Sequence, residues 1–339
     1  MHTSVTPTQG HTPSPDLPSL WHFFWNTNKA MTLFFLSNFV FLAIGLIGMA
    51  IDPRLVLGQS TWAKLTKFSL SLLIYAPTML WMFSYVTARK RLMGFVLNAI
   101  AVILFIEMVT ILFQGARAEA MHFNISTPLN TALWSFMSFT ITLFYVISFV
   151  GFGVLAMQKL TDASFAWSLR LGMVLMLVGF GLGYLMTIPQ PEQQAVIAAG
   201  QQPTRIGGHT VGAPDGGEGL ALLGWSTNHG DLRIAHFVGI HGLQVLAFVG
   251  WYLLRRSQQP GNRLTSRHRM TLVWGSFVAY LGLVALVTWQ ALRGQSLIAP
   301  DVLTLTVLGG LIVVTGAFVV ATLLHARSTA PHEISSIAV

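Results

Sequence analysis

Long apolar stretches dominate this sequence and limit what it can fold into. A helix needs about twenty apolar residues to cross the hydrocarbon core of a bilayer. Windows of that kind fall at residues 30–51, 66–87, 92–114, 131–156, 165–188, 232–254, 270–292 and 302–325. Helices satisfy their own backbone hydrogen bonds in lipid, so each window predicts a helix. The expected fold is therefore all-α, a polytopic membrane helix bundle of about eight transmembrane helices.

The composition agrees with a membrane protein and excludes several site types. Charged residues make up 9% of the chain, against roughly 25% in an average soluble domain. The net charge of +8 does not indicate nucleic-acid binding, because the Lys and Arg residues fall mainly in short loops between the apolar windows. The chain has no cysteine, which excludes disulfides, thiolate metal sites and iron–sulfur clusters.

The distribution of basic residues predicts the orientation in the membrane, because Lys and Arg concentrate in cytoplasmic loops. The loops after the second, fourth and sixth windows are basic; with the flanking window ends they hold Arg89, Lys90, Arg91, Lys159, Arg170, Arg255, Arg256, Arg263, Arg267 and Arg269. The other loops hold Arg54, Arg117, Arg205 and Arg293. We therefore expect both termini in the cytoplasm of a bacterium and the protein in its inner membrane.

This topology divides the chain into three parts. Residues 1–28, rich in Pro, Thr and Ser, are expected to form a disordered cytoplasmic tail. Residues 29–325 form the transmembrane domain, with one long extracytoplasmic loop at 189–231 that we expect to fold as an ordered lid. Residues 326–339 form a second cytoplasmic tail. Gly179 and Gly239 lie in small-residue stretches of the fifth and sixth windows and predict close packing of those helices.

The sixth window and the residues before it carry the most informative polar cluster. Asp231 precedes the window, and Arg233, His236, His241 and Gln244 lie inside it. Ionisable groups in a bilayer are costly unless they are paired, so such a cluster predicts a functional site. With the expected orientation, the site lies in the outer half of the membrane.

Two other windows carry polar residues at a similar depth. In the third window Glu107, Gln114 and Arg117 share one narrow helical stripe. A lone carboxylate there must be paired or protonated, so we expect Lys67 or Arg233 to lie beside Glu107. Lys67 is one turn deeper than Lys64 in the second window. We expect Lys64 to extend to the membrane surface.

The motifs also resemble those of a known family. A family of bacterial multi-spanning inner-membrane proteins of uncharacterised function has segments that resemble HTVGAPDGG, GWSTNHGDLRIAHFVGIHGLQ, QGARAEAMHFNISTP and TWQALRGQSLIAPD of this chain. The resemblance covers about residues 60–301. The family pattern has Ser where Met121 stands and Asp where Asn130 stands. The resemblance implies an inner-membrane protein and no particular reaction.

The first functional hypothesis is a membrane redox or metal-dependent enzyme. A divalent metal would be held by histidines and a carboxylate, for which the candidates are His122, His236, His241 and Asp231. Glu107 would complete a zinc site built on His122 and His236. A b-type haem would take His236 or His241 as one axial ligand, with His122 as the partner on another helix.

Two other hypotheses remain open. One is a transporter or receptor for a small polar or anionic molecule. Its ligand would be bound by Lys67, Gln114, Arg117, Arg233, Gln244 and Arg293, while Glu107 carries a proton or a cation. The other is a structural subunit of a membrane complex, in which the polar residues only join helices. In each case the bilayer is a partner and nucleic acid is not.

Overall fold

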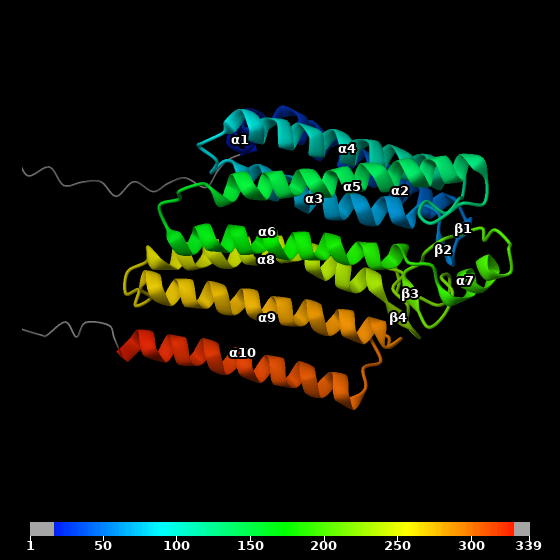
Figure 1. The fold of residues 1–339 in the computed structure, drawn as a ribbon. Helices are drawn as coiled ribbons and strands as arrows, with labels where there is room; N and C mark the ends of the chain where they lie inside the picture. The colour runs from blue at the N-terminus through cyan, green and yellow to red at the C-terminus, as the bar shows by residue number, and fades with distance from the viewer. Residues whose placement is uncertain (1–16, 329–339) are drawn as a thin grey trace, which may run out of the picture.

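The computed structural model describes residues 17–328, which form a bundle of long helices running roughly parallel to one axis (Figure 1). The long helices are α2 (Lys29–Ile51), α3 (Ala63–Phe83), α4 (Lys90–Ala116), α5 (Pro128–Ala156), α6 (Ala163–Gly183), α8 (Leu232–Ser257), α9 (Ser266–Leu292) and α10 (Val302–Ser328). Each overlaps one of the eight apolar windows. Seven of them, all but α3, are long and apolar enough to cross a membrane. The protein is therefore an all-helical membrane protein.

Helix α3 differs from the other seven because it carries polar and helix-breaking residues. Lys64 and Lys67 occupy its first turns, and Pro77 lies in its interior. A proline removes one helical hydrogen bond, yet α3 continues without interruption to Phe83. Its length of 21 residues corresponds to about 30 Å at 1.5 Å per residue, the thickness of a bilayer core.

The connections gather at two ends of the bundle (Figure 1). The lid end holds the short strands β1 (Leu55–Val56), β2 (Gln59–Ser60), β3 (Thr210–Val211) and β4 (Gly230–Asp231), together with η1 (Tyr184–Thr187) and α7 (Pro191–Ala198). The opposite end, called here the terminal end, holds the basic connections 84–89, 157–162 and 258–265. Helix α10 also ends at the terminal end. Helix α1 (Leu17–Thr27) lies at the same end, beside α2.

Part of the tail expected at 1–28 is folded. Residues 17–27 form α1, where the rings of Trp21 and Trp25 stack at 5.2 Å and Phe24 packs on the core. The prediction of disorder is therefore wrong for these residues, because their aromatic side chains find apolar partners. Residues 1–16 and 329–339 lie outside the described part of the chain, and with them the rest of both predicted tails.

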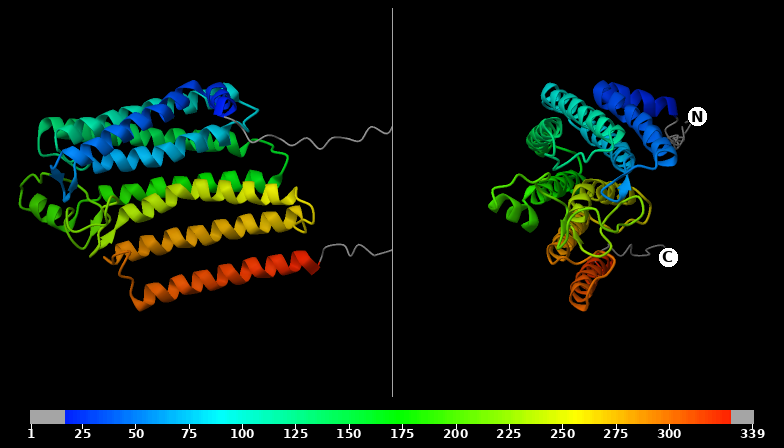
Figure 2. Two further views of the ribbon diagram at one scale, coloured as in Figure 1. Left: turned by 180° about the vertical axis from the view of Figure 1, so that it is seen from behind. Right: turned by 90° about the vertical axis from the view of Figure 1, so that its right-hand side faces the viewer.

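The helices form two groups, α2–α5 and α6 with α8–α10 (Figure 2). The closest packing joins α6 to α8, where Gly179 faces Gly239. A Cβ added at Gly179 would lie 2.3 Å from the backbone nitrogen of Ile240, so only glycine permits this approach. This confirms the close packing predicted from the glycines. Helix α10 packs beside α9 at the edge of the bundle and is largely exposed.

Residues 189–231, called here the lid, are folded. Strand β3 pairs with β4 in an antiparallel register that sets Thr210 opposite Asp231. Isolated bridges join Asn124 to Arg205 and Gly219 to Ser226. The pairing of β3 with β4 brings the middle of the lid back to the residue at which α8 begins. The lid is therefore attached to the bundle at its centre as well as at its two ends.

Candidate functional site

A cavity of about 800 Å³ lies beneath the lid. This chamber is enclosed by α3, α8, the 119–123 connection and the lid, with Tyr280 of α9 on one side. Ligand-binding pockets are typically about 300–1,000 Å³, so the chamber is large enough for a sizeable organic molecule. Its charged wall comprises Lys64, Lys67, Arg205, Arg233, Glu119 and Glu218. The histidines in the wall are His122, His209, His229, His236 and His241.

The two lysines of α3 have only neutral partners. They lie three residues apart and so share one face of the helix. Lys64 Nζ donates to His122 Nδ1 at 3.0 Å. Lys67 Nζ donates to Gln59 Oε1 at 3.0 Å and to the carbonyl of Leu223, in the lid, at 2.8 Å. Within residues 17–328 neither lysine forms an ion pair with a carboxylate.

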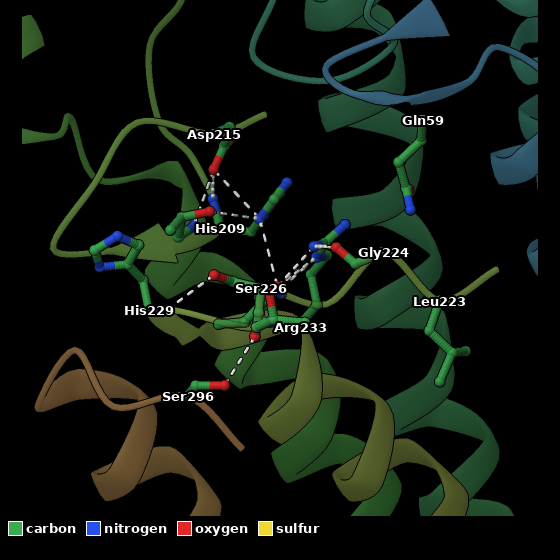
Figure 3. Close-up of polar contacts among 12 residues, drawn as sticks. Gln59, His209, Asp215, Leu223, Gly224, Ser226, His229, Arg233 and Ser296 are labelled. Atoms are coloured by element: carbon green, nitrogen blue, oxygen red, sulfur yellow. Dashed lines mark hydrogen bonds and ion pairs between the residues drawn. The ribbon is translucent and has the colours of Figure 1, made fainter. Parts of the chain in front are cut away.

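The two arginines of the chamber, by contrast, are each paired with a buried aspartate. Arg233 Nη2 lies 2.6 Å from Asp231 Oδ2. Asp231 has no exposed surface, caps α8, and also accepts from the backbone N–H of Ser226. Arg233 donates in addition to the carbonyl of Gly224 (Figure 3). Asp231 therefore fixes both the start of α8 and the direction of the Arg233 guanidinium.

The second pair lies in the lid itself. Arg205 Nη2 lies 3.1 Å from Asp215 Oδ2, and the other oxygen of Asp215 accepts from the backbone N–H groups of His209 and Thr210. Figure 3 shows Asp215 directed toward His209. Ion pairing and backbone hydrogen bonds thus compensate both arginines, which leaves the two lysines as the cations of the chamber without a contacting negative charge.

Two chamber histidines outside the membrane-spanning helices, His122 and His209, are held neutral. Burial lowers the pKa of His209 to about 3, with Arg233 acting in the same direction and Asp231 opposing it. The pKa of His122 also falls well below its usual value because the ring is buried and lies beside Lys64. A neutral His122 is the form that can accept a hydrogen bond from the Lys64 ammonium through Nδ1. These rings therefore add polarity to the chamber without adding charge.

The two glutamates of the chamber are bound by asparagines. Glu119 Oε2 accepts from Asn124 Nδ2 at 3.1 Å and from Asn130 Nδ2 at 3.2 Å. Glu218 Oε2 accepts from Asn228 Nδ2 at 3.2 Å. Neither carboxylate contacts a cation among the described residues. The chamber therefore holds separate positive and negative groups rather than one compensated network.

The structure brings together part of the predicted ligand-binding set. Lys67 and Arg233 line the chamber, and so do His122, His236 and His241. Glu107 does not: it is buried against α5 and accepts a hydrogen bond from Thr140. Neither Lys67 nor Arg233 pairs with it, so the prediction of such a pair is wrong. The hydroxyl of Thr140 supplies the partner that the carboxylate needs at that depth.

The remaining predicted ligand-binding residues lie elsewhere. Gln114 and Arg117 bind each other and Asn130, joining α4 to α5. Arg293 forms an ion pair at 2.5 Å with Asp301, between α9 and α10. Gln244 faces α3 below the chamber. The polar stripe of α4 is real, but it faces α5 and not the chamber.

The predicted metal set is not assembled. Among residues 17–328 no three His, Cys, Asp or Glu side chains are grouped so that they could hold a metal ion. Asp231 is saturated by Arg233 and Ser226, and His236 Nδ1 donates to the carbonyl of Gly179 at 2.8 Å. The positive charge of Lys64 beside His122 also disfavours a cation there. The metal-binding prediction is thus unsupported, and haem ligation stays a prediction.

Several chamber residues were missed or misjudged at the level of sequence. Lys64, expected at the membrane surface, turns into the chamber because the lid and His122 cover that end of α3. His209 reaches the chamber through the β3–β4 pairing beside it, and Arg205 through an isolated bridge to Asn124; neither pairing has a sequence pattern that would predict it. The available signal was the spacing of Lys64 and Lys67, which places both ammonium groups on one helical face.

Comparison of the chain with models of protein families, with curated proteins and with solved structures finds no match. The function is therefore inferred from the chamber itself.

Proposed function

We propose that this protein is an integral membrane protein that binds a small polar or anionic molecule in the chamber, as a transporter or receptor for that molecule. The observation that carries the proposal is the pair of lysines without contacting carboxylates, Lys64 and Lys67, in a covered cavity of about 800 Å³. Cations removed from water are stabilised by an opposite charge. An anionic group of the ligand would supply it.

The partners of the lysines support reversible binding. Gln59 and the Leu223 carbonyl are neutral acceptors for Lys67, and His122 is a neutral acceptor for Lys64. An anion attracts an ammonium group by a Coulomb interaction between opposite charges, which a neutral acceptor lacks. An anion can therefore replace these acceptors with a gain in binding energy. Because Leu223 belongs to the lid, such a replacement would also loosen the hold of α3 on the lid.

The proposal includes an orientation. All eight long helices are taken to span the membrane, with both termini in the cytoplasm and the chamber on the outer side. The basic terminal end supports this orientation, since it holds Arg89, Lys90, Arg91, Lys159, Arg255, Arg256 and Arg263. The resemblance to bacterial inner-membrane proteins supports that membrane as the location. The ligand would then reach the chamber from the periplasmic side or from the outer leaflet.

The same chamber gives less support to a metal- or haem-dependent enzyme. Its wall holds four cationic side chains, and its candidate ligands are already engaged by protein groups. A structural subunit is also less supported, because a cavity of this size with charged side chains in its wall serves no purpose in joining helices. Binding of an anion explains both the cavity and the two lysines without contacting carboxylates, which the other two hypotheses leave unexplained.

The proposal is tested by ligand-dependent stability of the purified protein in detergent. Inorganic phosphate, succinate and sn-glycerol 3-phosphate are added separately, with glycerol and choline as uncharged and cationic controls. We expect at least one anion to raise the thermal unfolding midpoint in a saturable manner, since binding to the folded state stabilises it. Metal content and visible absorbance of the same sample test the cofactor alternative.

Two variants make this test specific. The double variant Lys64→Gln, Lys67→Gln should abolish the stabilisation, whereas Lys29→Gln should preserve it, because Lys29 is exposed at the terminal end. Stabilisation that survives in the double variant, or its absence with all three anions in the wild-type protein, would overturn the proposal.

A further inference from the structure

Beyond the chamber a second cavity lies between the same two helices, α3 and α8, and the strip of surface between the two cavities is called here the groove. On α3 the wall of the chamber and then of the groove is formed by Lys64, Lys67, Ser71, Ile74, Thr78 and Trp81. On α8 it is formed by Phe237, His241, Gln244, Phe248 and Trp251. Spacings of three and four residues place each set on one helical face. The two stripes face each other along about 25 Å of α3, at 1.5 Å per residue.

The groove opens sideways on the surface of the bundle. Ile74 lines the chamber and is 54% exposed, and Leu70 beside it is 41% exposed. Farther along, Phe248 is 60% exposed where the groove widens to a second cavity of about 380 Å³. In a helix that spans a bilayer, such side chains face hydrocarbon. The chamber can therefore be reached from within the membrane.

The groove is too narrow for a helix of another protein. Ser71 Oγ lies 3.5 Å from His241 Nε2 across it, and the rings of Phe68 and Phe237 meet at 6.5 Å. A packed helix needs 8–10 Å between axes on each side. These contacts close the inner part of the groove, so a hydrocarbon chain would lie on its exposed outer side, against Ile74, Phe248 and Trp251. The occupant that fits is a chain molecule and not a protein segment.

The groove also carries one unsatisfied polar atom. Gln244 Oε1 is buried and has no well-formed hydrogen bond among the described residues; the donor beside it is the ring of His241. Gln244 lies between the cationic chamber and the apolar part of the groove. A buried acceptor without a well-formed hydrogen bond is costly. A hydroxyl or amide group near the junction of headgroup and chain would satisfy it.

We infer that the ligand is an amphiphile, a lipid with an anionic headgroup that enters from the bilayer. Its headgroup lies between Lys64 and Lys67 beneath the lid, and its hydrocarbon chain lies in the α3–α8 groove. The inference rests on the proposed function and narrows its ligand class. The charged wall of the chamber and the apolar side chains of the groove lie on the same two helix faces, so one amphiphile can contact both, whereas a soluble anion would contact only the first.

The test is titration of the full-length protein in detergent, followed by native mass spectrometry. Three probes are compared: 1-oleoyl-lysophosphatidic acid, lysophosphatidylcholine and sn-glycerol 3-phosphate. We expect the lysophosphatidic acid to bind about tenfold or more tightly than either of the others, because burial of each methylene contributes to affinity and the ammonium groups favour a headgroup with net negative charge.

Variants in the groove separate the chain site from the headgroup site. Ile74→Trp fills the groove and should weaken binding of the lysophosphatidic acid about tenfold or more, as expected when several chain contacts are lost. Ile312→Trp is the matched control, since Ile312 is 62% exposed on α10, away from the groove. Glycerol 3-phosphate binding should be equal in both variants.

The outcomes distinguish the two proposals. If glycerol 3-phosphate binds as tightly as the lysophosphatidic acid, or if Ile74→Trp behaves like Ile312→Trp, the lipid inference is overturned while the anion site stands. If lysophosphatidylcholine binds as tightly as the acid, the headgroup assignment to the lysines is overturned. If no probe binds and no soluble anion stabilises the protein, both proposals fail.

Discussion

The two sides of α8 differ in how they meet their neighbours. Toward α6 the helix is in backbone contact, because Gly179 and Gly239 lack side chains that would separate the two. Toward α3 it carries Phe237, His241 and Gln244, and a groove remains between the helices. The same helix is thus fixed on one side and separated from its neighbour on the other. The size of the residues at each contact decides whether the two helices touch or remain apart.

This difference has a functional consequence. The α6–α8 contact gives the chamber a rigid wall, because close-packed interfaces allow few alternative arrangements. The α3–α8 contact depends on a few side chains, such as Ser71 with His241 and Phe68 with Phe237. A ligand can displace those groups without disturbing the rest of the bundle. We therefore propose that one side of α8 contributes stability and the other side binds the ligand.

The largest effect on stability is expected at the close contact between α6 and α8. In Gly179→Ala the new Cβ would lie 2.3 Å from the Ile240 nitrogen and 2.5 Å from the Gly239 carbonyl carbon. Both are backbone atoms, so the helices must separate, and overpacking of this kind destabilises by about 3 kcal/mol. We expect a lower thermal unfolding midpoint. Gly153→Ala, on α5, meets nothing within 4 Å and should leave the midpoint unchanged or slightly raised; equal midpoints in the two variants would refute the account of this contact.

A smaller effect on stability is expected in the lid, which covers the side of α8 that faces α3. Burial lowers the pKa of His209 to about 3 from the ordinary value of 6.5. Because the folded-state pKa is depressed, the unfolded state binds a proton at a higher pH than the folded state does. The stability that the neutral His209 contributes is therefore present above pH 6.5 and is lost as the pH falls below it. From pH 7.5 to pH 5 this loss is about 2 kcal/mol.

The measurement is the unfolding midpoint across that range, for wild type and His209→Gln. The midpoint of the wild-type protein should fall more steeply with acidification than that of the variant, which lacks the titrating group. Parallel curves would show that His209 titrates normally in the folded lid.

Much of the fold could be predicted because apolar windows and glycine faces are local properties of the sequence. The eight windows became the eight long helices, and Gly179 with Gly239 marked the closest contact. The rotation of each helix about its own axis is not local, since it depends on the neighbours. That is why Glu107 was expected beside Lys67 but faces Thr140 of α5 instead.

The site was predicted in part for the same reason. The polar residues of α8 required a polar environment wherever they lay, so Arg233, His236 and His241 were found by the sequence alone. The residues that the lid contributes depend on a strand pairing of two residues on each side, Thr210–Val211 with Gly230–Asp231. So short a pairing has no sequence pattern of its own. Lys64 became a chamber residue only because the folded lid covers it.

The central claim is that the positive charge of Lys67 binds the ligand on the open side of α8. Calorimetric titration of the stabilising anion into wild type, Lys67→Gln and Lys67→Arg tests it directly. Loss of a charged hydrogen bond of about 1.5–3 kcal/mol weakens binding roughly ten- to a hundredfold. The account predicts that loss for Lys67→Gln, and affinity within about threefold of wild type for Lys67→Arg, which keeps the charge. Equal affinity of wild type and Lys67→Gln would contradict it.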